Sequence, residues 1–362
     1  LFFSRRRELE TMIYHCEDHT CNYWDEGEKL PERCPQCGRK LLRANEADMT
    51  GDDWTALGNT LWDAEASDKK RMVDCFRKAA YLGSAWGVCN LGICMEQGNG
   101  VEADPVQAFW LYQQAVEMGS LNAVCCLGVC YEYGIGTAPD AKQAAELYCK
   151  AAEYGSPRGQ MLLACAFHDG IGVEADAAEA VHWVRAAAYQ RYGEGMYWLG
   201  VCYEYGDGVE QNWEHAVHWF REAAESGVSV AMTDLGYCYE KGCGVEQSWE
   251  QAFSWYRRGA ECGYPVSMSN LGLCYKRGYG VEQNWQEAIK WYEQGAQCGD
   301  LQSMHNLARC YERGEGVEQN EDRALYWYRR SAEGGNGGAM YNLGRCYKMG
   351  HGVEQNWQEA VK

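Results

Sequence analysis

The stretch 235-LGYCYEKGCGVEQSWEQAFSWYRRGA-260 decides the fold of this chain, because its pattern returns every 36 residues. A fixed period of this length indicates a stack of similar structural units. Such stacks usually act as binding surfaces rather than as enzymes. The leucine-glycine pair recurs as Leu91-Gly92, Leu127-Gly128, Leu199-Gly200, Leu235-Gly236, Leu271-Gly272 and Leu343-Gly344, with Leu163-Ala164 and Leu307-Ala308 in the two gaps.

The first half of each unit predicts a helix with one buried face. In the quoted unit Ala231, Leu235 and Tyr239 are spaced by four residues, as on one side of a helix. Gly242 predicts the end of this helix, because glycine adopts the left-handed conformation that commonly ends helices. A second glycine follows at Gly244. A phosphate-binding loop is disfavoured here, because no strand precedes the glycines and no lysine-hydroxyl pair follows them.

The second half of each unit predicts another amphipathic helix. Ala216, Phe220 and Ala224 follow the spacing of a buried helical stripe, and Gly227 predicts its end. Each of these helices is preceded by a residue whose side chain can cap it. The predicted caps are Asp104, Asp140, Asp176, Asn212, Ser248, Asn284, Asn320 and Asn356.

These residues resemble the Sel-1-like repeat family, helical-hairpin solenoids related to tetratricopeptide repeats, over residues 52–362. The resemblance implies an all-α fold, a right-handed α/α solenoid across residues 50–362 of about nine 36-residue units. The first unit is modified around Leu57-Gly58. The last is cut short at Lys362, so we expect the natural protein to continue. The resemblance also implies a non-enzymatic scaffold or adaptor that binds a peptide or protein in the concave groove of the array.

Candidate partner-binding residues lie on the first helices. The position before the repeating leucine holds Asp234, Asn270, Asn306 and Asn342, a column suited to an extended peptide backbone. The alternative is that these side chains bond to the neighbouring repeat. The position two residues after the leucine adds the candidate interface residues Tyr237, Arg309 and Arg345, which could equally form a solvated face.

The N-terminal segment carries a different chemistry. Cys16, Cys21, Cys34 and Cys37 can converge as four thiolates on one tetrahedral metal ion. With Cys34-Pro35-Gln36-Cys37-Gly38, residues 13–45 resemble a rubredoxin-like zinc ribbon, which implies one structural zinc ion and a second contact module. Four residues rather than two separate the first cysteine pair, which disfavours redox iron. His19, or less favourably His15, is an alternative ligand, and unmetallated thiols remain open.

Composition narrows the function classes. The net charge of −19 disfavours binding to nucleic acid, and no apolar run is long enough to span a membrane. Residues 1–12 are expected to be a non-native or disordered lead. Of the 20 cysteines, seven form a column three residues after the leucine, where equivalent helices are too far apart for disulfides. We therefore expect a monomeric solenoid in the reducing cytoplasm.

The alternative function is that of a redox protein with iron in the ribbon, or of a hydrolase with its site in the groove. The histidines on the predicted repeat helices lack a serine or cysteine placed to act with them, so no catalytic residue is predicted. Metal analysis with a visible spectrum separates zinc from iron in the ribbon.

Overall fold

The computed structural model describes residues 13–16, 24–26, 41–44, 46–63 and 65–361. The chain divides into two compact units, residues 1–183 and 184–362. The boundary falls inside one helix, α8 (Ala177–Tyr189). Each unit is described by itself below.

The first unit begins with a three-stranded antiparallel sheet. Its strands are β1 (Ile13–Cys16), β2 (Trp24–Glu26) and β3 (Leu41–Ala44), in the order β2-β1-β3. A short 3-10 turn, η1 (Glu46–Asp48), leads into the helices. These are α1 (Gly51–Thr60), α2 (Ala66–Tyr81), α3 (Ala85–Gln97), α4 (Pro105–Glu117), α5 (Leu121–Tyr133), α6 (Ala141–Glu153) and α7 (Pro157–Asp169).

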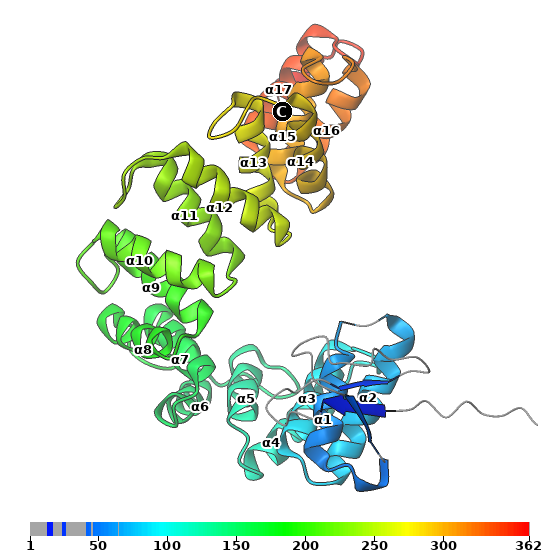
Figure 1. Ribbon diagram of the computed structural model, residues 1–362, viewed down its shortest axis with the longest axis vertical. Helices are drawn as coiled ribbons and strands as arrows, with labels where there is room; N and C mark the ends of the chain where they lie inside the picture. The colour runs from blue at the N-terminus through cyan, green and yellow to red at the C-terminus, as the bar shows by residue number, and fades with distance from the viewer. Residues whose placement is uncertain (1–12, 17–23, 27–40, 45, 64, 362) are drawn as a thin grey trace, which may run out of the picture. The chain divides into compact units, whose positions relative to one another are not determined.

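The second unit is helical throughout its described residues. After α8 it contains α9 (Gly193–Tyr205), α10 (Trp213–Glu225), α11 (Ser229–Lys241), α12 (Trp249–Glu261), α13 (Pro265–Arg277), α14 (Trp285–Gln297), α15 (Leu301–Arg313), α16 (Glu321–Glu333), α17 (Gly337–Met349) and the 3-10 turn η2 (Glu359–Val361). The helices α9, α11, α13 and α15 each pack against the even-numbered helix that follows, α17 packs against η2, and consecutive hairpins follow one another within the unit (Figure 1). The predicted solenoid of helical hairpins is confirmed.

The ends of the helices follow the predicted local signals. The first helix of each 36-residue unit ends at a left-handed glycine, such as Gly242 (φ 74°) or Gly278 (φ 73°). The second helix begins at a polar cap: Asn284 accepts hydrogen bonds from the backbone amides of Gln286 and Glu287. Such caps satisfy amides that the helix itself leaves free.

The leucine-glycine period is a packing requirement between the two helices of a hairpin. A β-carbon at Gly272 would lie only 2.6 Å from a ring carbon of Tyr292, so glycine leaves room for the aromatic ring of the second helix. The equivalent rings of Tyr112, Tyr148, Tyr256 and Tyr328 are also fully buried. Burial of each ring contributes on the order of 2–3 kcal/mol to folding. The period therefore fixes how closely paired helices approach.

The second glycine of each loop allows contact between neighbouring hairpins. Gly280 has φ +68°, and a β-carbon there would lie 2.1 Å from the carbonyl oxygen of Trp249. Trp249 begins α12, the second helix of the preceding hairpin. The equivalent glycines Gly100, Gly136, Gly172, Gly244 and Gly352 likewise lie against a backbone carbonyl oxygen of the hairpin before them, whereas Gly316 meets the side chain of Trp285 first.

Candidate binding surface on the first helices

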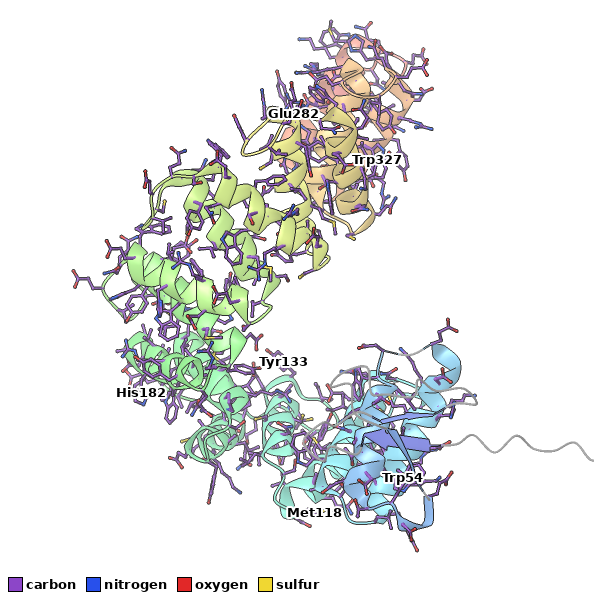
Figure 2. All side chains as sticks on the ribbon, viewed as in Figure 1. Trp54, Met118, Tyr133, His182, Glu282 and Trp327 are labelled. Carbon is purple, nitrogen blue, oxygen red and sulfur yellow. The ribbon has the colours of Figure 1, made fainter. Side chains whose placement is uncertain are left out.

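The exposed face of the first helices changes in character along the chain. Six residues after the repeating leucine, Tyr133 is 70% exposed and projects from α5 (Figure 2), and Tyr205 is exposed at the same position of α9. In α11, α13 and α15 this position holds Lys241, Arg277 and Arg313, which are all exposed. The later repeats therefore present cations where two earlier ones present tyrosines.

Several side chains of the predicted amide column bond inside the protein. Nδ2 of Asn342 lies 2.9 Å from Nε2 of His305, on the first helix of the preceding hairpin. Asp234 accepts a hydrogen bond from Tyr197 in the same relation, and burial raises the pKa of the Asp234 carboxyl. This geometry is the alternative that the sequence left open, a bond to the neighbouring repeat.

The other two amides lie differently. Oδ1 of Asn306 accepts from Nε2 of Gln302, one turn earlier in α15, at 3.2 Å. Asn270 is half-buried on α13 and has no hydrogen-bond partner among the described residues. Asn270 therefore keeps its donors and acceptor available to a ligand.

The three predicted interface anchors also differ from one another. Tyr237 is 44% exposed on α11. Arg345 on α17 forms an ion pair with Glu312 of the preceding hairpin. Arg309 on α15 is half-buried and has no hydrogen-bond or ion-pair partner in the part of the chain that the structure describes.

A set of buried tyrosine-glutamate pairs joins the two helices of a hairpin. The glutamate lies five residues after the repeating leucine, and the tyrosine hydroxyl of the second helix donates to its carboxylate. These contacts are Tyr112–Glu96 (2.6 Å), Tyr148–Glu132 (2.6 Å), Tyr256–Glu240 (2.9 Å) and Tyr328–Glu312 (2.7 Å). Each pair satisfies a hydroxyl that would be costly to bury alone.

One hairpin keeps the tyrosine but lacks the glutamate. In α13 the glutamate position holds Lys276, which is buried and donates from Nζ to Glu315 at 2.8 Å. The hydroxyl of Tyr292 is then buried without a hydrogen-bond partner. Burial raises the pKa of Tyr292, and the charges of Arg277 and Arg309 act in the opposite direction. Cys310 and Cys274 also act on this hydroxyl and raise its pKa, and no carboxylate of the described residues accepts from it.

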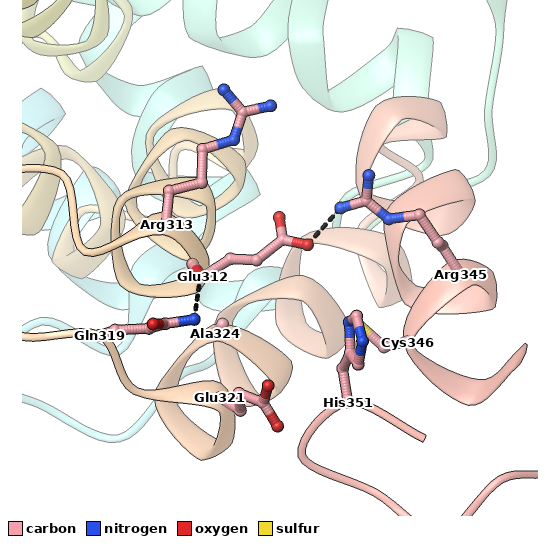
Figure 3. Close-up of a pocket in the computed structure, with 8 residues that line it drawn as sticks. All are labelled: Glu312, Arg313, Gln319, Glu321, Ala324, Arg345, Cys346 and His351. Carbon is pink, nitrogen blue, oxygen red and sulfur yellow. Dashed lines mark hydrogen bonds and ion pairs between the residues drawn. The ribbon is translucent and has the colours of Figure 1, made fainter. Parts of the chain in front are cut away.

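Two pockets of about 240 Å³ occupy equivalent places in successive hairpins. The Glu312 pocket is drawn in Figure 3, where the carboxylate of Glu312 points to the guanidinium group of Arg345. Its lining residues include Glu312, Arg313, Gln319, Glu321, Arg345 and His351. The Lys276 pocket is lined by Lys276, Arg277, Gln283, Trp285, Arg309, Arg313 and Glu315.

The cysteine column lies mainly in the core. Cys94, Cys130, Cys238, Cys274, Cys310 and Cys346 are buried, whereas Cys202 is half-buried. Burial raises the pKa of Cys94 to about 11 and that of Cys274 to about 12, which keeps these thiols protonated. They act as small apolar groups in the seam between helices.

The predicted metal ligands are not placed by the structure. Cys21, Cys34 and Cys37 lie outside the described residues, and Cys16 is described only as the last residue of β1. Over the remainder of the described chain, no group of three or more His, Cys, Asp or Glu side chains could hold a metal ion. None of the described helices is long and apolar enough to cross a membrane.

Comparison with known proteins identifies the repeats. The Sel1 repeat family profile matches residues 87–120, 123–156, 157–192, 193–228, 229–264, 265–300, 301–336 and 338–362. A Sel1 repeat protein from Oxalobacter formigenes is 34% identical with a TM-score of 0.60, and the match covers 66% of this chain and 94% of that protein. A comparison with curated protein sequences finds no match.

More distant structures share the fold. The protective antigen c5321 of uropathogenic Escherichia coli, which displays an SLR fold, is 28% identical with a TM-score of 0.60 over 86% of this chain and 75% of the antigen. The human IFIT1 dimer with PPP-AAAA is 13% identical with a TM-score of 0.50 over 83% of this chain and 73% of its own, a likeness of fold alone.

Proposed function

This chain belongs to the Sel1 repeat family, and from that premise we propose that it is a non-enzymatic scaffold that binds a peptide or protein along its first helices. Sel1 and tetratricopeptide-like solenoids are typically used for protein-protein interaction. The observation that carries the proposal is the availability of polar and aromatic groups on α11, α13 and α15. Tyr237 is exposed, and Asn270 and Arg309 have no partner among the described residues.

The proposal narrows the predicted partner surface. Tyr237, Asn270 and Arg309 are proposed to contact the partner directly, because arginine and tyrosine are frequent interface anchors. Asp234, Asn342 and Arg345 bond to the neighbouring hairpin, so they are proposed to position this surface. Asn306 bonds within its own helix and remains a candidate contact.

Affinity capture with quantitative mass spectrometry tests the proposal. The test variant changes Tyr237, Asn270 and Arg309 to alanine. The matched control changes Tyr326, Gln286 and Lys290, an exposed aromatic, amide and cation on second helices, to alanine. The partner captured by the wild type should be lost from the test variant and kept by the control. Equal capture by both variants would contradict the proposal.

We further propose that Cys16, Cys21, Cys34 and Cys37 hold one structural zinc ion in a ribbon that serves as a second contact module. The spacing of the cysteines supports this site, and a closed four-thiolate zinc site leaves no position for a substrate. We expect mass spectrometry to find one equivalent of zinc, and the visible spectrum to show no absorption band. Stoichiometric iron with visible charge-transfer bands would overturn it.

The environment proposed for the scaffold is the cytoplasm, where it acts as a monomer. Reduced thiols suit a reducing compartment, and none of the cysteines from Cys75 to Cys346 is in a disulfide. Sedimentation of the purified protein at several concentrations checks the monomer, which a concentration-dependent increase in mass would contradict.

A further inference from the structure

The Lys276 pocket differs from its neighbour by lacking an acceptor. Tyr292 and Arg309 stand thirty-six residues before Tyr328 and Arg345, and Lys276 stands in the same relation to Glu312. In the Glu312 pocket the carboxylate accepts from the Tyr328 hydroxyl at 2.7 Å. The same carboxylate pairs with Arg345 (Figure 3). A single carboxylate therefore serves a hydroxyl and a guanidinium group at once.

The corresponding groups of the Lys276 pocket have no such acceptor. The Tyr292 hydroxyl is fully buried and unpartnered. Among the described residues, Arg309 and Arg277 have no ion-pair partner, and Lys276 turns its Nζ to Glu315. A buried donor without an acceptor costs about 1–3 kcal/mol. The arrangement is that of a site from which one acceptor has been removed.

The other hairpins indicate what the missing group is. Where the tyrosine is satisfied, as at Tyr112, Tyr148, Tyr256 and Tyr328, the acceptor is the carboxylate of a glutamate. Each of these glutamates projects from the first helix into the same position. A carboxylate supplied from outside the chain can complete the set in the same geometry, because arginine binds planar carboxylates through paired donors.

We propose that the Lys276 pocket binds a glutamate or aspartate side chain from an acidic segment of the protein partner. This inference rests on the proposed function and names the chemistry of the partner. The incoming carboxylate accepts from the Tyr292 hydroxyl and pairs with Arg309, in the place that glutamate fills elsewhere. Tyr292 is fully buried and does not itself line the pocket, so binding requires that Lys276, which has a long and flexible side chain, rotates to uncover the hydroxyl.

The surroundings of the pocket favour an acidic peptide over a phosphate. Arg277 and Arg313 are exposed beside it and can meet further acidic side chains of an extended segment. Glu315 lines the same pocket, and its carboxylate repels a dianion more strongly than it repels a monoanion. In a chain of net charge −19, this cluster of cations is a local exception and matches a partner of opposite charge.

Fluorescence anisotropy on the full chain tests the proposal. The probe is a fluorescein-labelled hexaglutamate peptide with an amidated C-terminus, so that only side-chain carboxylates are offered, and hexaglutamine is the neutral comparison. At a salt concentration of about 0.1 M, where remote charges are screened, hexaglutamate should bind and hexaglutamine should not. Equal binding of the two peptides would overturn the proposal.

Three variants separate a specific pocket from a diffuse positive field. Tyr292→Phe keeps every charge and should weaken hexaglutamate binding about tenfold or more, the effect of one lost hydrogen bond to a charged group. Arg309→Gln should weaken binding by about tenfold or more, through loss of a charged partner. Lys276→Glu should abolish binding, because its own carboxylate then fills the place of the ligand.

Matched controls lie in the Glu312 pocket and on a remote surface. Tyr328→Phe removes the equivalent hydroxyl from the neighbouring pocket, and Arg257→Gln removes one exposed charge from α12. Both should bind hexaglutamate within about twofold of the wild type, because neither touches the Lys276 pocket. An unchanged affinity in Tyr292→Phe, or equal losses in Arg257→Gln and Arg309→Gln, would contradict a built carboxylate site.

Two further arms distinguish the ligand and the two proposals. Inorganic phosphate and a single-stranded oligonucleotide are tested as competitors of hexaglutamate. If either displaces the peptide, and the displacement depends on Arg309 and Tyr292, the ligand is a phosphate group rather than a carboxylate and the proposal is overturned. If hexaglutamate fails to bind while partner capture still depends on Tyr237, Asn270 and Arg309, the carboxylate pocket fails and the scaffold stands. If hexaglutamate binding depends on Tyr292 while a variant that changes only Tyr237 and Asn270 to alanine keeps its captured proteins, the scaffold surface fails and the pocket stands.

Discussion

The Glu312 pocket and the Lys276 pocket share their backbone frame and differ in one side chain at its centre. Both lie between the first helices of successive hairpins, and both are lined by an arginine, Arg345 or Arg309. In each case the second helix of the first of the two hairpins carries a fully buried tyrosine, Tyr328 or Tyr292. In one, Glu312 satisfies Tyr328 and Arg345. In the other, Lys276 leaves Tyr292 without an acceptor. Repetition thus fixes the frame, and a departure at one position within it creates an opening for a ligand.

The comparison also explains how a repeat protein acquires specificity without losing its fold. The tyrosine ring is part of the packing of its hairpin: Tyr112, Tyr148, Tyr256 and Tyr292 lie against the glycine of the leucine-glycine pair, and Tyr328 is fully buried in a hairpin that has Ala308 at that position. The glutamate is not part of that packing, because its carboxylate bonds to polar groups: the tyrosine hydroxyl and, in the case of Glu312, also Arg345. Exchange of the glutamate therefore changes the chemistry of the surface and leaves the packing of the ring in place.

The largest effect is expected where the shared frame itself is broken. Gly280→Ala places a β-carbon 2.1 Å from the carbonyl oxygen of Trp249 at φ +68°, so we expect a loss of about 3 kcal/mol in the free energy of unfolding. Gly316→Ala, in the loop of the Glu312 pocket, meets the side chain of Trp285 first, at 2.6 Å, and should cost less. Urea denaturation measures both. Equal losses would show that the two loops do not differ as described.

The second-largest effect is expected when the carboxylate of Glu312 is removed from its pocket. Glu312→Ala leaves the Tyr328 hydroxyl and Arg345 without their acceptor, and should cost about 2–3 kcal/mol. Lys276→Ala should cost less, because Arg313 remains 3.6 Å from Glu315 after the lysine is removed. Thermal denaturation compares the two variants. A larger loss of stability in Lys276→Ala than in Glu312→Ala would contradict the conclusion that the Glu312 pocket satisfies its own polar groups and the Lys276 pocket does not.

A smaller effect, with opposite signs in the two pockets, is expected from the hydroxyl groups. Tyr328→Phe removes a hydrogen bond to a carboxylate and should destabilise the protein by about 1–2 kcal/mol. Tyr292→Phe removes a buried hydroxyl that has no partner, so stability should be unchanged or higher by up to about 1 kcal/mol. Chemical denaturation of the two variants checks this. Destabilisation of both by the same amount would mean that Tyr292 has an acceptor in solution.

The smallest effect concerns pH at the edge of the Lys276 pocket. Burial alone raises the pKa of Glu315, but the hydrogen bond and charge of Lys276 outweigh it and lower the pKa below its ordinary 4.5. A lowered native pKa means that the ion pair stabilises the protein fully above pH 4.5 and is lost as the pH falls through the native pKa. Glu315→Gln should therefore cost under about 1 kcal/mol at neutral pH, and less below pH 4.5.

Denaturation curves between acid and neutral pH measure that dependence. The control is His351→Gln, which changes the equivalent position of the Glu312 pocket and removes no carboxylate. Its effect should not change across pH 4.5. A Glu315→Gln effect that is constant with pH would contradict the ion pair with Lys276.

Much of the fold could be predicted from the sequence because its signals are local. The stop at Gly242 and the cap at Asn284 depend on a few neighbouring residues, and both are confirmed. The repeating leucine-glycine pair located the hairpins. The reason why glycine recurs after the leucine could not be predicted, because the ring of Tyr292 contacts Gly272 only when the two helices of the hairpin are packed together.

The candidate site was less accessible to prediction. An amide such as Asn342 suits a ligand and a neighbouring helix equally, and the choice depends on His305, which packing brings to 2.9 Å. The Lys276 pocket did leave a signal in the sequence that the predicted site residues missed. Aligning the repeats at 36 residues places Lys276 in a column otherwise occupied by Glu96, Glu132, His168, Glu204, Glu240, Glu312 and Lys348. The consequence of lysine at this position could be recognised only from the structure, in which the hydroxyl of Tyr292 has no hydrogen-bond partner.

The most direct test of the difference between the two pockets is a crystal structure of the full chain with the amidated hexaglutamate peptide bound. We predict one glutamate carboxylate within hydrogen-bond distance of the Tyr292 hydroxyl and of Arg309, and no peptide carboxylate in the Glu312 pocket. Peptide density away from Tyr292, or a peptide carboxylate that displaces Glu312 from Arg345, would contradict the account.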